Sequence, residues 1–131
     1  MLVIDANVLA TVLLDDGPDG DLARSRLRGE RLTAPGLIDL EVASVVRGQH
    51  CGGLIDRRRS ELALGDLRVF PVRRAPHQAL IARCWELRDN LTTYDACYVA
   101  LAEVLEVTLL TADRRLGRAP GLHCPVEVIG H

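Results

Sequence analysis

The chain begins with MLVIDANVLATVLL (residues 1–14), and this stretch indicates the class of fold. The apolar run at residues 2–4 is typical of a buried strand, and it ends at Asp5. From residue 8 onward the apolar residues have helical spacing rather than strand-like alternation. A buried strand that passes directly into a helix is the start of a βαβ unit, with Asp5 and Asn7 at the turn.

Short strands and helices alternate along the rest of the chain. Further strands are expected at residues 31–35, 67–72, 107–110 and 125–129. Helices are expected at residues 8–14, 21–30, 37–50, 55–66, 76–90, 91–103 and 112–119. This alternation favours right-handed crossovers, and hence a short, mainly parallel sheet with helices on both faces. We therefore predict a three-layer α/β/α fold in a single domain, residues 1–131.

The composition limits what kind of protein this is. A chain of 131 residues, 48% of them hydrophobic, is long enough for an ordinary core. The formal net charge is only −2, so any contact with nucleic acid must rest on local patches, and all 16 basic residues are arginines. The four cysteines form no CxxC pair, and the apolar N-terminal run is too short to span a bilayer. We expect reduced thiols in a soluble, cytoplasmic protein with no membrane contact.

Four acidic residues come from four separate segments and point to one crevice. Asp5 follows the first expected strand, and Asp113 follows the strand at 107–110. Asp95 stands at the start of the helix that leads into that strand, and Glu41 lies on the helix after the second strand. Functional crevices in parallel sheets lie at the carboxyl ends of the strands, so these four side chains are expected to meet there.

Each acid also has a purely structural explanation. Asp95 stands three residues after Thr92, which fits a capping box at a helix start. Asp5 and Asp113 are each placed to cap the helix that follows, and Glu41 is placed to be an ordinary helical acid or an ion-pair partner. No single acid decides between structure and chemistry.

Considered together, the acids favour a cation site. Carboxylates crowded into a crevice repel one another unless a cation offsets them. Oxygen ligands without paired histidine or cysteine favour Mg²⁺ or Mn²⁺, which can activate water and clamp a phosphodiester. Asn7 and Thr111 add polar groups beside Asp5 and Asp113.

Four motifs carry a resemblance to a known family. The stretches VIDANVL (3–9), DLEVASVVRG (39–48), LTTYDACYVALAE (91–103) and LLTADRRL (109–116) resemble, in order and spacing, the acidic motifs of PIN-domain ribonucleases, specifically VapC-type toxins of bacterial toxin–antitoxin pairs.

The resemblance implies an activity and a set of site residues. It assigns Asp5, Glu41, Asp95 and Asp113 to a metal-binding acidic pocket, with Asn7 and Thr111 as polar support. It implies Mg²⁺-dependent cleavage of structured RNA, tRNA or ribosomal RNA, that leaves 3′-hydroxyl and 5′-phosphate ends. It also implies a VapB-like antitoxin that sends an arginine into the pocket, and a homodimer.

Two arginine clusters are candidate contacts to RNA phosphates. Arg24, Arg28 and Arg31 share a helical face if the helix at 21–30 extends that far, and Arg57, Arg58 and Arg59 form the second cluster. The structural alternative is a solvated face with ion pairs to Glu30, Asp56 and Glu61. With 3% aromatic residues, recognition of RNA would rest on backbone charge and shape rather than stacking.

Two other classes of function remain open at this point. A phosphotransfer domain also gathers acids around Mg²⁺ at strand ends, but it normally uses a lysine, which this chain lacks, and phosphatases of this layout have a second aspartate where Asn7 stands. A catalytically silent PIN-type binding module would use the pocket only to hold a partner. The sequence does not identify the RNA, the cleavage site or the number of metal ions.

Overall fold

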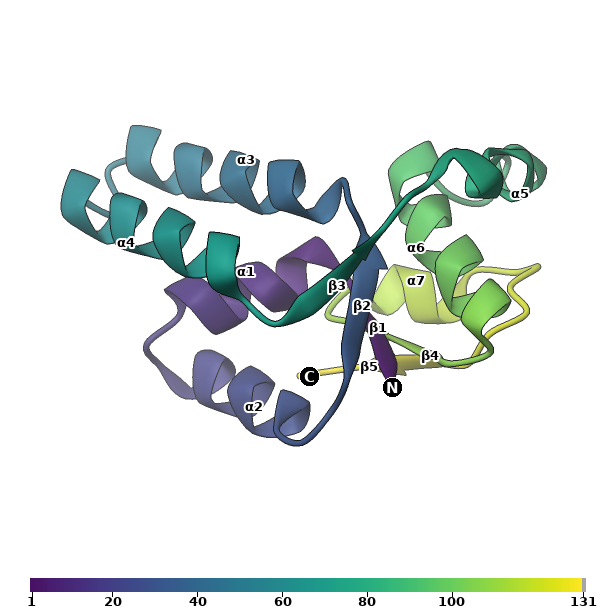
Figure 1. Ribbon diagram of the computed structural model, residues 1–131, viewed down its shortest axis with the longest axis horizontal. Coiled ribbons are helices and arrows are strands. Elements are labelled where there is room, and N and C mark those ends of the chain that lie inside the picture. The colour runs from purple at the N-terminus through teal and green to yellow at the C-terminus, as the bar shows by residue number, and fades with distance from the viewer. Residues whose placement is uncertain (131) are drawn as a thin grey trace.

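The computed structural model describes residues 1–130, which form a three-layer α/β/α sandwich (Figure 1). All neighbouring strands pair in parallel in the order β3-β2-β1-β4-β5. The strands are β1 (Leu2–Ile4), β2 (Leu32–Pro35), β3 (Val72–Ala75), β4 (Thr108–Thr111) and β5 (Val126–Val128). This architecture confirms the fold predicted from the sequence.

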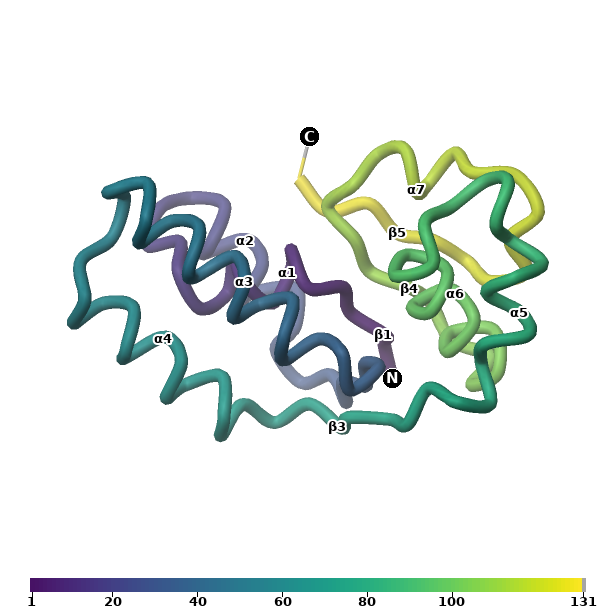
Figure 2. The backbone as a smooth tube through the Cα atoms, turned by 90° about the horizontal axis from the view of Figure 1, so that it is seen from above, coloured from purple at the N-terminus to yellow at the C-terminus, as the bar shows by residue number. Residues whose placement is uncertain are grey.

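Helices cover both faces of the sheet. The helical elements are α1 (Ala6–Leu14), α2 (Pro18–Leu27), α3 (Ile38–Cys51), α4 (Arg57–Val69), the 3-10 turn η1 (Gln78–Leu80), α5 (Ile81–Glu86), α6 (Thr93–Leu105) and α7 (Arg114–Arg118). Figures 1 and 2 show α1 to α4 on one side of the sheet and α5 to α7 on the other. Among the helices formed by residues 1–130, none has the length and apolar character that a bilayer crossing requires.

The strand order creates a switch point beside β1. After β1 the chain adds β2 and β3 on one side, and it then crosses to β4 and β5 on the other. The crevice of such a sheet lies outside the carboxyl ends of the strands at this switch point. Asp5 follows β1 and Asp113 lies two residues beyond β4, so both acids lie at that crevice.

Buried side chains hold the elements around the crevice in place. Helix α6 is buried at every position from Ala96 to Ala102, and it packs on β1, β2 and β4. Leu109 and Leu110 of β4 are fully buried, as is Ile4 of β1. Each such side chain contributes roughly 1.5–3 kcal/mol by burial, so the backbone that carries the acids is firmly anchored.

Two boundaries differ from the sequence-based prediction. The strand expected at 67–72 is the last turn of α4 followed by β3, because Leu67 is buried one helical turn after Ala63 and continues the helix. Pro71 lacks an N–H for the ladder, and β3 begins one residue later. The helix expected at 76–90 is only η1 followed by the short α5.

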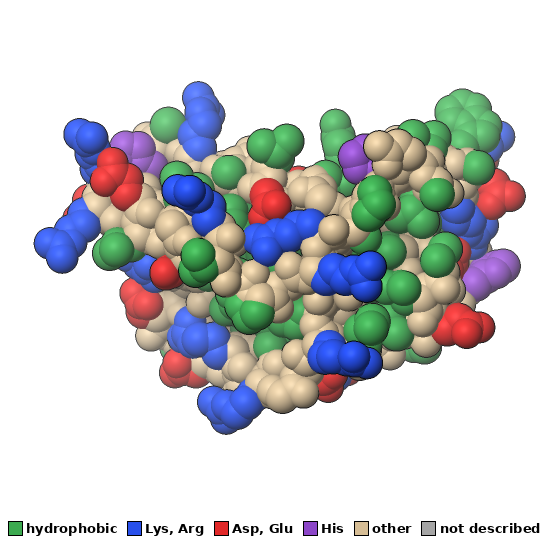
Figure 3. Space-filling model, in the orientation of Figure 1, with side chains coloured by type: hydrophobic (Ala, Val, Ile, Leu, Met, Phe, Trp, Pro, Cys, Tyr) green, Lys and Arg blue, Asp and Glu red, His purple; other side chains and the backbone are tan. Residues whose placement is uncertain are grey.

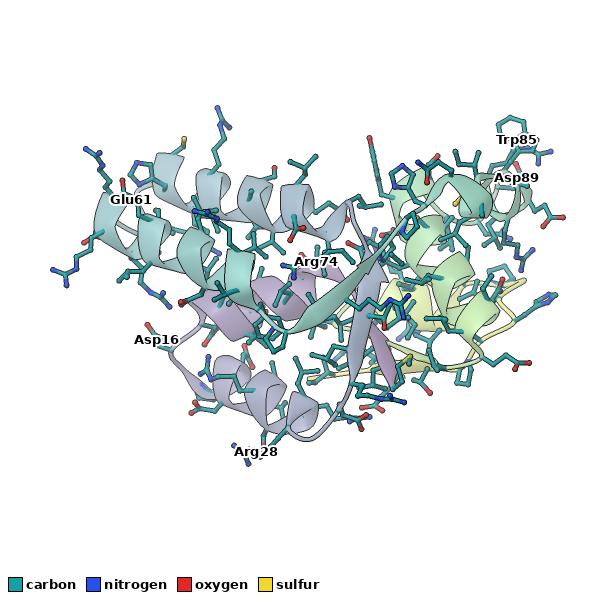
Figure 4. The ribbon with its side chains drawn as sticks, in the orientation of Figure 1. Asp16, Arg28, Glu61, Arg74, Trp85 and Asp89 are labelled. Atoms are coloured by element: carbon teal, nitrogen blue, oxygen red, sulfur yellow. The ribbon has the colours of Figure 1, made fainter. Side chains whose placement is uncertain are left out.

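Arg74 ties β3 to α4 and α3 (Figure 4). Its guanidinium donates to the carbonyl oxygens of Leu67 at 2.6 Å and Phe70 at 3.0 Å, which satisfies the C-terminal end of α4. It also pairs with Asp39 in the first turn of α3 at 3.0 Å. Because Glu41 lies two residues further along α3, this ion pair helps to fix the wall that carries Glu41.

Candidate active site

Asp5 is held by hydrogen bonds to both of its carboxylate oxygens. One oxygen accepts the N–H of Val8 at 2.9 Å and so caps α1, and the other accepts the hydroxyl of Thr111. Asp5 is only 9% exposed and Thr111 is fully buried. Since Thr111 ends β4, the neighbour of β1, this pair links the carboxyl ends of the two central strands.

Asp113 is joined to the same network through Thr111. The Asp113 N–H donates to the Thr111 hydroxyl oxygen at 3.0 Å. The carboxylate of Asp113 in turn accepts the N–H of Arg115 at 2.9 Å and caps α7. The exposed Arg115 guanidinium lies 3.3 Å from both carboxylate oxygens, where it partly offsets their charge.

Asp95 and Glu41 form the facing walls. The N–H of Asp95 donates to the Thr92 hydroxyl at 3.1 Å, so Thr92 caps α6, which is the threonine half of the predicted capping box. Glu41, on α3, accepts the hydroxyl of Tyr98 at 2.7 Å. Asp95 and Glu41 are both half-buried.

The acids line neighbouring cavities that share residues. One cavity of about 270 Å³ is lined by Asp5, Asn7, Glu41, Asp95 and Tyr98, together with Ala6, Ser44 and Val45. A second, of about 210 Å³, includes Asp95, Asp113 and Arg115. A third, of about 540 Å³, includes Asn7, Asp113 and Arg115. Asp95 and Asn7 each border two of these cavities, so the four predicted acids surround one stepped crevice.

Burial, and to a lesser extent neighbouring charge, raises the pKa of three of the four carboxylates. Burial raises the pKa of Asp5 to about 6, and the charges of Asp95 and Asp113 add to this rise. Burial likewise raises the pKa of Glu41 and of Asp95, with further contributions from Asp95 and Asp113 respectively. The pKa of Asp113 is lowered, chiefly by its hydrogen bond from the Arg115 side chain. The crevice therefore carries negative charge that Arg115 partly offsets.

The donor set fits a hydrated, hard divalent cation. All the candidate ligands are oxygens, which Mg²⁺ and Mn²⁺ prefer. Within residues 1–130, no group of three histidine, cysteine or acidic side chains is placed to hold a metal ion by itself. Mg²⁺ typically keeps several waters and needs only one or two protein carboxylates, so an open acidic crevice suits it better than it suits structural zinc.

Three of the six candidate RNA-contacting arginines have side-chain partners within the chain. Arg24 donates to the Val12 carbonyl oxygen at 2.8 Å and pairs with Asp21. Arg57 pairs with Glu61 at 2.9 Å, whereas Arg59 donates to the Leu13 carbonyl oxygen at 2.8 Å and lies 3.4 Å from Asp16. Asp16 and Glu61 are labelled in Figure 4.

The two clusters do not form one basic track. Helix α2 ends at Leu27, so Arg28 and Arg31 do not extend the helical face that carries Arg24. Glu30 pairs with Arg26 rather than with the predicted cluster. Arg28 and Arg58 are exposed, and Figure 3 shows basic side chains spread among other types on the face in view.

Two residues of the crevice were missed by reasoning from the sequence. Tyr98 lies within the apolar run of α6, and neither its contact with Glu41 nor Arg115 was singled out. For Tyr98 the available signal was its spacing, because a residue three positions after Asp95 lies on the same face of a helix.

Comparison with known proteins extends over nearly the whole chain. A family model described as PIN domain matches residues 2–122. Ribonuclease VapC9 of Mycobacterium tuberculosis is 42% identical over 132 residues, which cover 98% of this chain and 98% of the relative. Ribonuclease VapC1 of the same species is 38% identical over 128 residues, covering 97% and 96%.

Solved structures share the fold at low sequence identity. VapBC2 from Rickettsia felis, bound to a DNA fragment from its promoter, superposes with a TM-score of 0.69 over 97% of each chain at 13% identity. FitAcB from Neisseria gonorrhoeae gives a TM-score of 0.68 over 96% of each chain at 15% identity. These two likenesses concern the arrangement of helices and strands.

Proposed function

This chain belongs to the PIN-domain family, among the VapC ribonucleases of toxin–antitoxin systems, and on that premise we propose that it is a metal-dependent endoribonuclease. The proposed reaction is hydrolysis of a phosphodiester in structured RNA, tRNA or ribosomal RNA, by a metal-activated water. The products are a 3′-hydroxyl and a 5′-phosphate. The proposed site is the crevice of Asp5, Glu41, Asp95 and Asp113.

The observation that carries the proposal is the burial of several carboxylates beside one another in one crevice. Asp5 is buried with a raised pKa, and Asp95 and Asp113 increase that rise. Such a cluster is costly unless a cation offsets it. A bound Mg²⁺, or Mn²⁺ in its place, would supply that offset and would polarise both the attacking water and the scissile phosphate.

The chain's own residues prepare the crevice for this chemistry. Asp5 and Asp95 would hold the cation, and Thr111 orients Asp5 through its hydroxyl. Asp113 lies at the other end of the Thr111 network, where Arg115 keeps its carboxylate ionised. The exposed Asn7 lies on the rim shared by two cavities, where its amide can hydrogen-bond a phosphate oxygen or a water.

Binding of RNA would rest on charge and shape. Aromatic residues make up only 3% of the chain, so stacking platforms are scarce. Arg28, Arg31, Arg57 and Arg58 are exposed, whereas Arg24 and Arg59 are half-buried. The guanidiniums of Arg24, Arg57 and Arg59 have partners in the fold, so Arg28, Arg31 and Arg58 are better placed to contact phosphates.

The proposed protein partners are a VapB-like antitoxin and a second copy of the chain. A guanidinium from the antitoxin fits the same acidic crevice, because it supplies the positive charge that the carboxylates require and donates to two oxygens at once. A bound antitoxin would then exclude both the metal and the RNA.

The test is cleavage of RNA by the chain purified free of antitoxin. Purified tRNA and ribosomal RNA should be cut with Mg²⁺ or Mn²⁺ and remain intact in EDTA, and end mapping should find 5′-phosphates. Asp95→Asn should remove cleavage but keep the fold, since α6 is capped by Thr92. Cleavage that persists in EDTA would refute the metal mechanism, and a folded wild type that cuts no RNA would favour the silent binding module.

A further inference from the structure

Tyr98 is a buried polar side chain whose hydroxyl reaches into the acidic crevice. Its side chain is 2% exposed, and it belongs to α6, one turn after Asp95. The hydroxyl donates to one carboxylate oxygen of Glu41 at 2.7 Å. Tyr98 also lines the cavity that contains Asp5, Glu41 and Asp95.

This hydrogen bond joins the two walls of the crevice. Glu41 belongs to α3, on one side of the sheet, and Tyr98 belongs to α6, on the other (Figure 1). Within residues 1–130, it is the one side-chain hydrogen bond between these two helices. A bond from a neutral hydroxyl to a carboxylate is charge-assisted and therefore stronger than a bond between neutral groups.

The bond fixes a side chain that would otherwise be mobile. Glu41 is half-buried and has three rotatable side-chain bonds, and its second oxygen accepts no hydrogen bond within the described part of the chain. One oxygen is thereby held by Tyr98 while the other stays available to a ligand. Burial and the adjacent charges of Glu41 and Asp5 raise the pKa of Tyr98, so its hydroxyl remains a donor at neutral pH.

We propose that Tyr98 is a positioning residue, which orients Glu41 across the crevice so that its free oxygen faces the metal and its waters. The proposal rests on the metal-dependent function above and assigns a role to a residue outside the four acids. Groups that orient metal-binding side chains typically affect metal affinity or activity about 10–100-fold when they are removed. A tyrosine that only fills the core would lack this effect, since phenylalanine has nearly the same volume.

The experiment compares Tyr98→Phe with a matched control on the same helix. Tyr94 also lies in the first half of α6, but it is 63% exposed, so Tyr94→Phe removes a hydroxyl without touching Glu41. Tyr98→Phe should weaken Mn²⁺ binding, measured by calorimetry, about 10-fold or more. It should also lower kcat while KM for RNA changes less than about twofold, and Tyr94→Phe should resemble wild type.

A double mutant tests whether Tyr98 acts through Glu41. In a Glu41→Gln background, adding Tyr98→Phe should change Mn²⁺ affinity less than about twofold, because the carboxylate that Tyr98 orients is already gone. Thermal unfolding of each variant checks that the fold is retained.

The failures of the two proposals are distinguishable. An equal Mn²⁺ affinity in Tyr98→Phe and wild type would overturn the role of Tyr98, as would a full effect of Tyr98→Phe in the Glu41→Gln background. A wild type that neither binds Mn²⁺ nor cuts RNA would overturn the proposed function, and the role of Tyr98 with it.

Discussion

Helices α1 and α4 both start with an aspartate N-cap, but the surroundings of the two caps differ. Asp5 caps α1 and Asp56 caps α4, and each carboxylate accepts the N–H three residues later, at 2.9 Å from Val8 and 2.7 Å from Arg59. Both N-caps have extended backbone angles. At the level of local sequence and local hydrogen bonding, the two aspartates therefore have the same capping role.

Their surroundings separate structure from chemistry. Asp56 is exposed, at the start of α4, which lies at the left end of the molecule in Figure 1, away from the sheet. Asp5 is buried at the end of β1, where Thr111 binds its second oxygen and where the charges of Asp95 and Asp113 act on it. A capping role therefore does not exclude a functional one; the strand order decides which cap becomes part of a site.

The largest expected difference between the two caps is in catalysis. Asp5→Asn should lower RNA cleavage by about 10²–10³-fold, because a metal contributes several kcal/mol of transition-state stabilisation and the variant loses a charged ligand. Asp56→Asn should stay within about twofold of wild type, since asparagine caps a helix as well as aspartate does. The measurement is initial cleavage rate at saturating Mg²⁺.

Equal cleavage rates in the two variants would show that the buried cap and the exposed cap do not differ in catalysis. If Asp5→Asn cut RNA as fast as Asp56→Asn does, Asp5 would be only a buried cap, and the catalytic crevice would have to be assigned to other residues.

A smaller difference is expected in stability. The pKa of Asp5 is raised in the folded protein, from 3.8 to about 6, so the folded state holds this proton more tightly than the unfolded state. Its contribution is fully present below about pH 4 and is lost as pH rises through about 6. The loss is about 3 kcal/mol of unfolding free energy at 1.36 kcal/mol per pKa unit.

Denaturant unfolding in EDTA between pH 4 and 8 measures this slope. Asp5→Asn should remove the decline that Asp5 causes and should be more stable than wild type at pH 7, because the asparagine keeps the cap without the charge. Asp56→Asn should follow the wild-type curve. If the unfolding free energies of wild type and Asp5→Asn changed with pH in parallel, the pKa of Asp5 would not be raised by folding.

The fold was largely predictable because its signals are local. Short apolar strands such as residues 2–4 lead into helices with clear starts, and the alternation predicts a parallel sheet. The misplaced strand at 67–72 shows the limit of this reasoning. Leu67 belongs equally well to a helix or a strand on periodicity, and its packing decides.

The meeting of the acids in one crevice was predictable, as was Thr111 as a polar neighbour of Asp5, but the contacts of Tyr98 and Arg115 were not. Asp5, Asp95 and Asp113 stand at turns whose positions follow from strand and helix boundaries, so their convergence could be inferred. The bond between Tyr98 and Glu41 joins residues 57 positions apart, and no local pattern encodes it. The pairing of Arg59 with Asp16 and the Leu13 carbonyl likewise depends on how α4 packs beside α1.

Thermal unfolding of the antitoxin-free protein in EDTA and in Mn²⁺ at pH 7.5 tests directly whether these carboxylates form one cation site. A ligand at 100 times its dissociation constant stabilises the folded state by about 2.7 kcal/mol. If the carboxylates do form one site, we expect a midpoint several degrees higher in Mn²⁺ for wild type and for Asp56→Asn, and little or no rise for Asp5→Asn. The same midpoint for wild type in EDTA and in saturating Mn²⁺ would contradict a shared cation site.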